Sequence, residues 1–121
     1  MQQTDAVQAG LAYIEENLKA DIRISDLAAH CHYSPWHYRA LFSRAVGFSV
    51  AAYILKRRLE RALMEIAAGK TAAEVVGAYG FDTYAGFYKA FVRMYGCSPK
   101  KYLSIYRTYE PKRTEERHML T

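Results

Sequence analysis

The chain has 121 residues, a formal net charge of +5 and a sequence pI of about 9.2. This length allows one compact unit or two very small ones, and an apolar share of 51% excludes a globally disordered chain. The positive charge favours an anionic partner, with nucleic acid ahead of a membrane surface. No apolar run approaches the ~18 residues of a spanning helix, and the N-terminus lacks the features of a signal peptide. We therefore expect a cytoplasmic protein with no membrane partner.

The first part of the chain predicts three helices. The first is expected over residues 5–18, and the second is short, capped by Ser25 and ended near Cys31. The third covers residues 34–46, because Ser34 can cap it and the proline that follows fits its first position. Gly47 supplies the left-handed residue that ends it.

The third helix has two different faces. At helical spacing its inward stripe is Tyr38, Leu41, Phe42 and Ala45. The residues that flank this stripe or face away from it are Trp36, His37, Arg39, Ala40, Ser43 and Arg44. An exposed Trp with Arg on a short helix of a basic protein indicates a surface that reads DNA. The alternative for the Trp is a partly buried core position.

The second part of the chain predicts four more helices. Ser49 opens a long helix over about 50–67, on which Arg61 and Glu65 are spaced to form an i,i+4 pair. Thr71 and Thr83 are expected to cap the next two helices, which end near residues 79 and 95. A last helix runs from about 98 to 106, and the polar stretch 107–121 is expected to be a tail or linker. The predicted fold is all-α, with about seven helices.

One unit of this pattern occurs twice. With an offset of 49 residues, a Ser or Thr cap, core aromatics and a stopping Gly all coincide: Ser34 with Thr83, Phe42 with Phe91, Arg44 with Arg93, Gly47 with Gly96, Ser49 with Ser98, Tyr53 with Tyr102. The repeated unit is a helix-turn-helix, whose second helix commonly enters the major groove. The two copies cover about 24–47 and 72–96. The linker helix over 50–67 would be ~27 Å long, which approaches the ~34 Å between successive major grooves on one face of DNA.

These features together resemble the DNA-binding domain of the AraC/XylS family of bacterial transcription regulators, over about residues 5–106. The residues that carry the resemblance are Ile24–Leu27 with Ala28; Tyr33–Arg39; Leu41-Phe42; Gly47-x-Ser49; Tyr53-Ile54-x-x-Arg57-Arg58-Leu59; Ala78–Phe81; and Phe87-x-x-x-Phe91 leading to Gly96-x-Ser98-Pro99-x-x-Tyr102. The resemblance implies that the third and sixth helices are recognition helices. It also implies similarity to the short members, which are monomeric activators without an attached sensor. We expect the second partner to be RNA polymerase, contacted through an exposed helix face.

The resemblance implies base-reading roles for Trp36, Arg39 and Ala40 in one groove, and for Ala85, Tyr88 and Lys89 in the next. Residues expected at the DNA backbone are Ser34, His37, Arg44, Lys56, Arg57, Thr83, Lys100 and Lys101. For the lysines and Arg57 the alternative is ordinary solvated charge, and His37 could instead cap its helix. Arg58 is a candidate for either a phosphate contact or an internal ion pair.

Some residues depart from the family pattern. Ala40 and Ala85 offer at most contact with a thymine methyl, and Gly86 weakens the start of its helix. The second unit is therefore expected to bind more weakly, or to read DNA shape more than base edges.

Other residue patterns predict neither a cofactor nor catalysis. His30-Cys31-His32 cannot converge on one metal ion, since consecutive helical residues diverge by about 100°. Cys31 is expected in the core, and Cys31 and Cys97 are expected to be reduced and unpaired. Tyr79 and Tyr95, at helix ends, are explained by core packing with a hydroxyl near water. No Gly-rich phosphate loop, Ser-His-Asp pattern or paired carboxylates appear.

We therefore expect a sequence-specific, nucleoid-associated transcription regulator that reads two major-groove segments with helices 34–46 and 83–95. Two alternatives stay open at this point. The chain could be the DNA-binding part of a longer ligand-sensing regulator. It could also be a helical protein-interaction module whose DNA binding is weak or lost.

Overall fold

The computed structural model describes residues 2–105, and within this range it contains helices and no strands. The helices are α1 (Gln3–Glu16), α2 (Ile24–His30), α3 (Pro35–Val46), α4 (Val50–Ala67), α5 (Ala72–Ala78) and α6 (Tyr84–Tyr95). A further helix begins at residue 99 and continues to residue 105, the last one described. The predicted all-α fold is confirmed. The stretch 107–121, expected to be a tail, lies outside the described residues.

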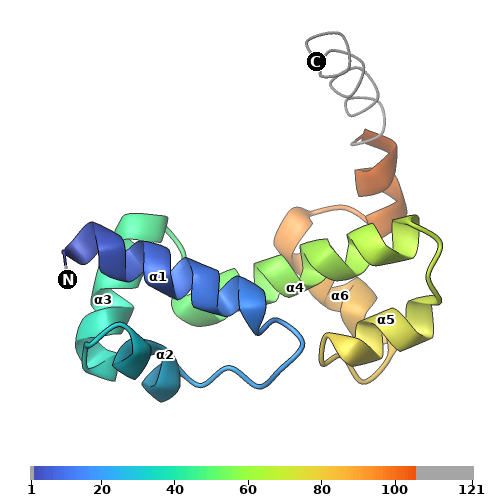
Figure 1. Cartoon of the computed structure of the whole chain (residues 1–121). Coiled ribbons are helices and arrows are strands. Elements are labelled where there is room, and N and C mark those ends of the chain that lie inside the picture. Colours follow the sequence, from blue (N-terminus) through green and yellow to red (C-terminus); the bar gives the residue numbers. More distant parts are fainter. Residues whose placement is uncertain (1, 106–121) are drawn as a thin grey trace, which may run out of the picture.

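The helices form two groups connected by α4 (Figure 1). Helices α1, α2 and α3 pack on one another at one end, whereas α5 and α6 pack on each other and on α4 at the other end. The pairs α2–α3 and α5–α6 are the two helix-turn-helix units. The expected architecture, two such units joined by a long helix, is therefore confirmed.

The first unit is built around Tyr38 and Phe42, both fully buried on α3. The Tyr38 hydroxyl donates a hydrogen bond of 3.1 Å to the carbonyl of Ala6 on α1. Cys31 is fully buried beside these residues, as predicted, and both cysteines are free thiols. Buried aromatic area of this kind supplies most of the free energy that holds a small helical unit together.

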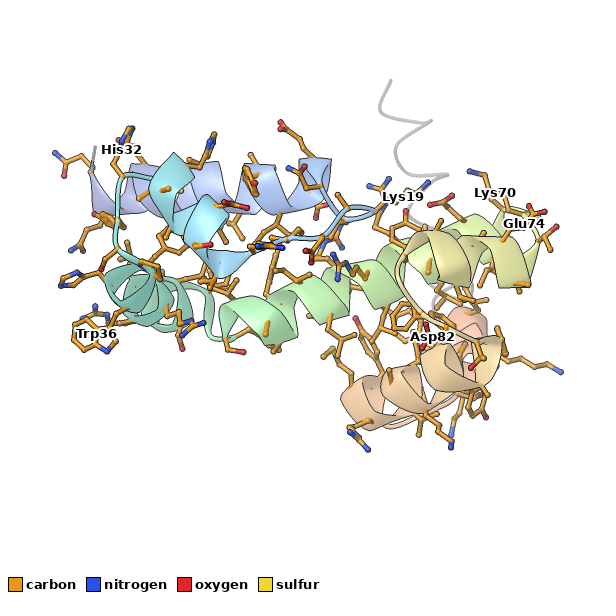
Figure 2. All side chains as sticks on the ribbon, turned by 90° about the horizontal axis from the view of Figure 1, so that it is seen from below. Lys19, His32, Trp36, Lys70, Glu74 and Asp82 are labelled. Carbon is orange, nitrogen blue, oxygen red and sulfur yellow. The ribbon has the colours of Figure 1, made fainter. Side chains whose placement is uncertain are left out.

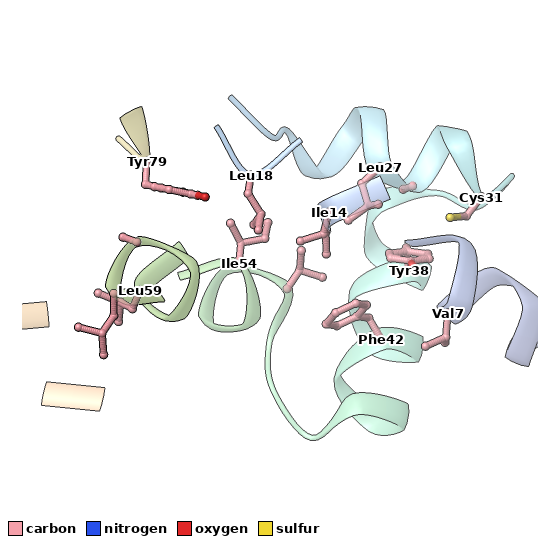
Figure 3. Packing of buried hydrophobic residues seen from close by; sticks show 14 of the residues in the cluster. Val7, Ile14, Leu18, Leu27, Cys31, Tyr38, Phe42, Ile54, Leu59 and Tyr79 are labelled. Atoms are coloured by element: carbon pink, nitrogen blue, oxygen red, sulfur yellow. The ribbon is translucent and has the colours of Figure 1, made fainter. Parts of the chain in front are cut away.

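The core continues from one unit to the other along α4 (Figure 3). Leu18, just after α1, points toward Ile54 on the first half of α4, and Leu59 follows one turn later. Beyond it the core includes Phe87 and Phe91 of α6, which are fully buried. Because both units share one set of buried residues, α4 is part of the core and not an exposed tether.

The recognition helices of the two units are locally equivalent. Helices α3 and α6 each have 12 residues and a capped start: the Ser34 hydroxyl accepts from the His37 amide at 3.2 Å, and the Thr83 hydroxyl accepts from the Gly86 amide at 3.0 Å. Each ends at a left-handed glycine, Gly47 with φ 85° and Gly96 with φ 74°. The repeat predicted from the sequence is present in the structure.

Two predictions about the first helices are wrong. Helix α2 begins one residue before Ser25, with Arg23 at the cap position and no side-chain cap bond. Its start is set by the Leu27 amide, which donates to the Arg23 carbonyl, and by the burial of Leu27. Helix α1 lies two residues earlier than expected, because Ala6 is fully buried and Asn17 ends the helix by donating to the Tyr13 carbonyl at 2.7 Å.

Two further differences concern α3 and α5. Ala45 is exposed, and Val46 is partly buried at the end of the α3 stripe in its place. Thr71 occupies the cap position of α5 as expected, but its side chain forms no cap hydrogen bond. Across residues 2–105, no helix is both long and apolar enough to cross a bilayer.

Candidate nucleic-acid interface

Helix α3 presents one continuous face to solvent. Trp36 is 75% exposed, and Arg39, Ala40, Ser43 and Arg44 are exposed with it. Figure 2 shows Trp36 at the edge of the molecule, with its ring pointing away from the ribbon. The alternative interpretation, in which Trp36 is a partly buried core residue, is therefore wrong. The inward stripe of Tyr38, Leu41 and Phe42 is buried in the core, so these outward side chains project from a packed helix.

Helix α6 presents a similar but smaller face. Ala85, Tyr88 and Lys89 are exposed, whereas Phe87 between them is fully buried. The ring of Tyr88 lies 6.4 Å from that of Tyr84, centroid to centroid, which places an aromatic pair at the start of the helix. All six residues predicted to read bases are thus exposed, three on each recognition helix.

The charges on these two helices have one sign. Helix α3 carries Arg39 and Arg44, helix α6 carries Lys89 and Arg93, and neither helix contains Asp or Glu. Within residues 2–105 none of these four cations forms an ion pair. The ion pairs that are present join residues of α1, α4 and their adjoining loops: Lys19–Glu65, Arg23–Asp21, Lys56–Glu60, Arg57–Glu15, Arg57–Glu60 and Lys70–Glu65. The two helices therefore keep their positive charge available for phosphates and guanine edges.

Several predicted backbone contacts lie at exposed helix starts. The His37 ring places Nδ1 2.8 Å from the Ser34 hydroxyl, so His37 takes part in the cap that the sequence offered as its alternative role. Thr83 occupies the same place on α6. Lys100 and Lys101 are exposed at the start of the last helix, where the Ser98 hydroxyl accepts from the Lys101 amide at 3.1 Å. Helix starts of this kind bind anions through free amides and the helix dipole.

An open groove lies beside α3. Its walls include the apolar side chains of Ile24, Trp36 and Ile54, together with the guanidinium-bearing Arg39. An apolar wall next to a cation suits a base edge that combines a methyl group with hydrogen-bond acceptors.

Lys56 and Arg57 occupy a different environment from the other predicted anchors. Their side chains are only 28% and 26% exposed, and Glu60 pairs with both: its oxygens lie 2.6 Å from Lys56 Nζ and 2.6 Å from Arg57 Nη1. Arg57 also donates to Glu15 of α1, and this hydrogen bond raises the pKa of the Arg57 guanidinium further above its ordinary value. Both cations are compensated inside the protein, and a phosphate contact for either stays a prediction.

The expected roles of Arg58 and Arg61 need correction. Arg58 forms no internal ion pair within the described residues; it donates to the carbonyls of Leu18 at 2.9 Å and Ala20 at 2.6 Å. Glu65 pairs with Lys70 at 2.8 Å and with Lys19 at 3.7 Å instead of with Arg61. The reason is that the loop after α1 and the turn after α4 bring the cations of Lys19 and Lys70 to Glu65.

Comparisons with known proteins agree with this two-unit organisation. The family model of a helix-turn-helix domain matches residues 27–105. The chain is 31% identical over 101 residues to the HTH-type transcriptional activator AarP of Providencia stuartii, covering 83% of this chain and 75% of AarP. It superposes with a TM-score of 0.74 on a transcriptional regulator from Chromobacterium violaceum described as AraC-type, at 20% identity, covering 81% and 88% of the two chains. The chain belongs to the AraC/XylS family. It is a DNA-binding transcription regulator of the helix-turn-helix type.

A second solved structure has the same fold. It is the DNA-binding domain of AdpA in complex with a target DNA, with a TM-score of 0.68, 24% identity, and coverage of 87% of this chain and 96% of that one. The AraC/XylS resemblance drawn from the sequence motifs is confirmed. Several relatives in this family are longer, and the chain spans 36–41% of their length.

Sequence reasoning on this AraC/XylS chain missed one set of polar residues. The Tyr79 hydroxyl donates to Glu65, and the Tyr95 hydroxyl donates to Glu60, where water had been expected. Burial raises the pKa of both tyrosines, and their glutamate partners raise it further. The available signal was weak: two glutamates on the half-buried side of α4, with partners 14 and 35 residues away in the chain.

Proposed function

We propose that this AraC/XylS regulator binds an asymmetric duplex site as a monomer, with α3 in one major groove and α6 in the next. The observation that carries the proposal is the pair of capped helices at the two ends of α4, each with an exposed, carboxylate-free face. Helix α4 has 18 residues and is ~27 Å long, close to the ~34 Å repeat of the major groove. In Figure 2, α3 and α6 both lie toward the lower edge of the molecule, and α1 lies along the upper edge.

Different reading roles are proposed for the two helices. Arg39 and Lys89 are the candidates for guanine, since Arg or Lys to guanine is the commonest specific pairing. Trp36 and Ala40 form an apolar surface for thymine methyl groups at the groove beside α3. On α6, Ala85 offers only a methyl contact and Tyr88 a single hydroxyl, so the second element should be less strictly specified than the first.

The backbone anchors proposed are Ser34, His37, Arg44, Thr83, Lys100 and Lys101. They are exposed and lie at or near helix starts or on α3 itself. Lys56 and Arg57 would act as anchors only after leaving Glu60, which makes them the weakest of the proposed contacts.

The remaining functional expectations are part of the same proposal. RNA polymerase is the second partner, and activation is the direction of regulation, in line with the name of the similar protein AarP. The protein would act at the nucleoid in the cytoplasm, without a cofactor and without catalysis. Its DNA-binding domain is proposed to cover about residues 5–106. Because several relatives are longer, a regulator with a further sensing domain is the second candidate.

Selection of bound duplexes from a random pool at about 0.15 M salt tests this function, because salt in this range suppresses the non-specific term. The proposal predicts two short, dissimilar elements centred about 10 base pairs apart. Enrichment of one element alone would mean that α6 is only an anchor. Absence of any binding would favour the interaction-module alternative that the small residues Ala40, Ala85 and Gly86 suggest.

A further inference from the structure

The two units are joined by a polar cluster as well as by the shared core. We define the Glu60 cluster as Glu15 of α1, Lys56, Arg57 and Glu60 of α4, and Tyr95 of α6. Both oxygens of Glu60 are used: one accepts from Arg57, and the other accepts from Lys56 and Tyr95. Arg57 also donates to Glu15, so a continuous chain of hydrogen bonds runs from α1 through α4 to α6.

The members of this cluster are held on their far sides as well. Tyr95 stacks on Phe91 with ring centroids 4.7 Å apart and meets the edge of Tyr102 at 5.0 Å. Glu15 lies on the last turn of α1, and the loop after α1 is fastened to α4 by Arg58, which donates to two carbonyls there. A change in the orientation of α1 relative to α6 would therefore break or stretch charged hydrogen bonds.

The environment makes these contacts stronger than surface ion pairs. The side chains of Glu60, Arg57 and Lys56 are 19%, 26% and 28% exposed, so water screens them only in part. Burial by itself would raise the pKa of Glu60, but the hydrogen bonds from Lys56, Tyr95 and Arg57 outweigh it and hold this pKa below its ordinary range. Glu60 is thus a charged acceptor at ordinary pH.

The chain between α3 and α4 is the point at which the units could rotate. It consists of residues 47–49, and the first of these is a left-handed glycine. Helix α3 is held on α1 through Tyr38 and Ala6, and α6 packs on α4 through Phe87 and Phe91. The Glu60 cluster adds polar contacts at both joints, from Arg57 to Glu15 of α1 and from Tyr95 of α6 to Glu60. These contacts therefore restrict the angle between α3 and α6.

We propose that Glu60 is a positioning residue that fixes α3 relative to α6, and that the Glu60 cluster thereby sets the spacing between the two DNA elements. This role rests on the proposed function, in which one chain reads both elements. Each added base pair moves the second element by ~3.4 Å and rotates it by about 35° around the duplex axis. A rigid protein accepts one spacing, whereas a protein that can rotate about residues 47–49 accepts several.

The test measures affinity for duplexes that carry both selected elements at the selected spacing, and at spacings one base pair shorter or longer. The variants are Glu60→Gln and Tyr95→Phe. The matched control is Glu74→Gln, since Glu74 is exposed on α5 and the hydrogen bonds that define the cluster include no residue of that helix. The readout is the ratio of affinities between spacings for each protein. This ratio cancels any uniform gain that results from freeing Lys56 or Arg57 to meet phosphates.

Wild-type protein and Glu74→Gln should discriminate by about tenfold per base pair of misplacement. Glu60→Gln and Tyr95→Phe should both reduce this to about threefold or less. Tyr95→Phe, which leaves Lys56 and Arg57 paired with Glu60, should bind a duplex with only the first element as tightly as wild type does. Tyr95→Phe keeps the ring packing on Phe91, so this variant alone tests the positioning role if Glu60→Gln unfolds the protein.

Two outcomes would contradict the proposal. If Tyr95→Phe discriminates between spacings as strongly as wild type, the positioning role is wrong. A flat wild-type profile would instead overturn the two-element function on which this role depends.

Discussion

At the scale of single residues, the contact between Gly10 and Tyr38 fixes how α1 meets α3. Tyr38 is fully buried, and burial raises the pKa of its hydroxyl, which stays protonated and donates to Ala6. A Cβ placed on Gly10 would lie 1.7 Å from that hydroxyl oxygen. Gly10 is therefore present to admit the tyrosine, although glycine inside a helix costs stability relative to alanine.

Gly10→Ala should destabilise the protein by about 1–3 kcal/mol, because Tyr38 has no room to retreat inside the packed core. Gly77→Ala is the control on α5, where an added Cβ meets nothing within 4 Å. This second change should stabilise the protein by about 0.5–1 kcal/mol through helix propensity. Urea unfolding of both variants measures the free energies. Equal stabilisation by the two substitutions would show that the α1–α3 contact is looser than the structure indicates.

The residues proposed to read bases belong to the same scale, and the sequence correctly predicted that they face outward. Their outward positions follow from the apolar stripe Tyr38, Leu41 and Phe42, which leaves only one face of α3 for other partners. Two ion pairs of α4 could not be predicted in this way. Arg57 pairs with Glu15 of α1, and Glu65 pairs with Lys19 in the loop after α1, so no spacing along α4 identifies either partner.

At the scale of elements, local signals determine where most helices begin and end. Ser34, Ser49 and Thr83 each accept a hydrogen bond from the amide three residues on, as their residue types predicted. Thr71 holds the same position before α5 without forming that bond. Residue type therefore predicts the cap position of these four helices but not that of α2, which begins before Ser25. The hydroxyl rotamer and the local φ and ψ decide whether the cap bond is formed.

Ser49→Ala should cost about 1 kcal/mol, because it removes the acceptor for the Ala52 amide at the start of α4. Thr71→Ala should change the free energy of unfolding by less than about 0.5 kcal/mol, since no cap bond is lost. Chemical denaturation at one pH and salt concentration compares them. A loss of similar size in both variants would mean that Thr71 forms a cap bond in solution.

At the scale of the whole molecule, polar side chains along α4 form contacts with both units and so connect them. Glu65 is the second such point: it accepts from Lys70 and Tyr79 and pairs with Lys19 in the loop after α1. The hydrogen bond from Lys70, followed by the one from Tyr79, holds the pKa of Glu65 at about 2. Sequence patterns predicted two units and a connecting helix. They did not predict the contacts of Glu65 with Lys19 and Tyr79, because these residues are far apart in the chain.

The low pKa of Glu65 predicts how stability depends on pH. In the unfolded chain a glutamate has a pKa of about 4.3, so the stabilisation is complete above that value and is lost as pH falls toward about 2. Glu65→Gln should therefore be less stable than wild type at pH 6, and the difference should shrink at pH 3. Urea titrations at the two pH values measure it, with the exposed Glu74→Gln as control. A difference that stays constant with pH would contradict the assigned role of the Glu65 carboxylate.

The most direct test of the central claim, that one chain reads two successive major grooves, is methylation interference at guanine N7, which lies in the major groove. With one protein per duplex, two clusters of interference should appear about 10 base pairs apart on one face of the DNA. Arg39→Ala should remove interference in one cluster, Lys89→Ala should remove it in the other, and Lys101→Ala should weaken binding to all duplexes alike. A single cluster, or equal weakening of both clusters by Arg39→Ala and by Lys89→Ala, would contradict the account.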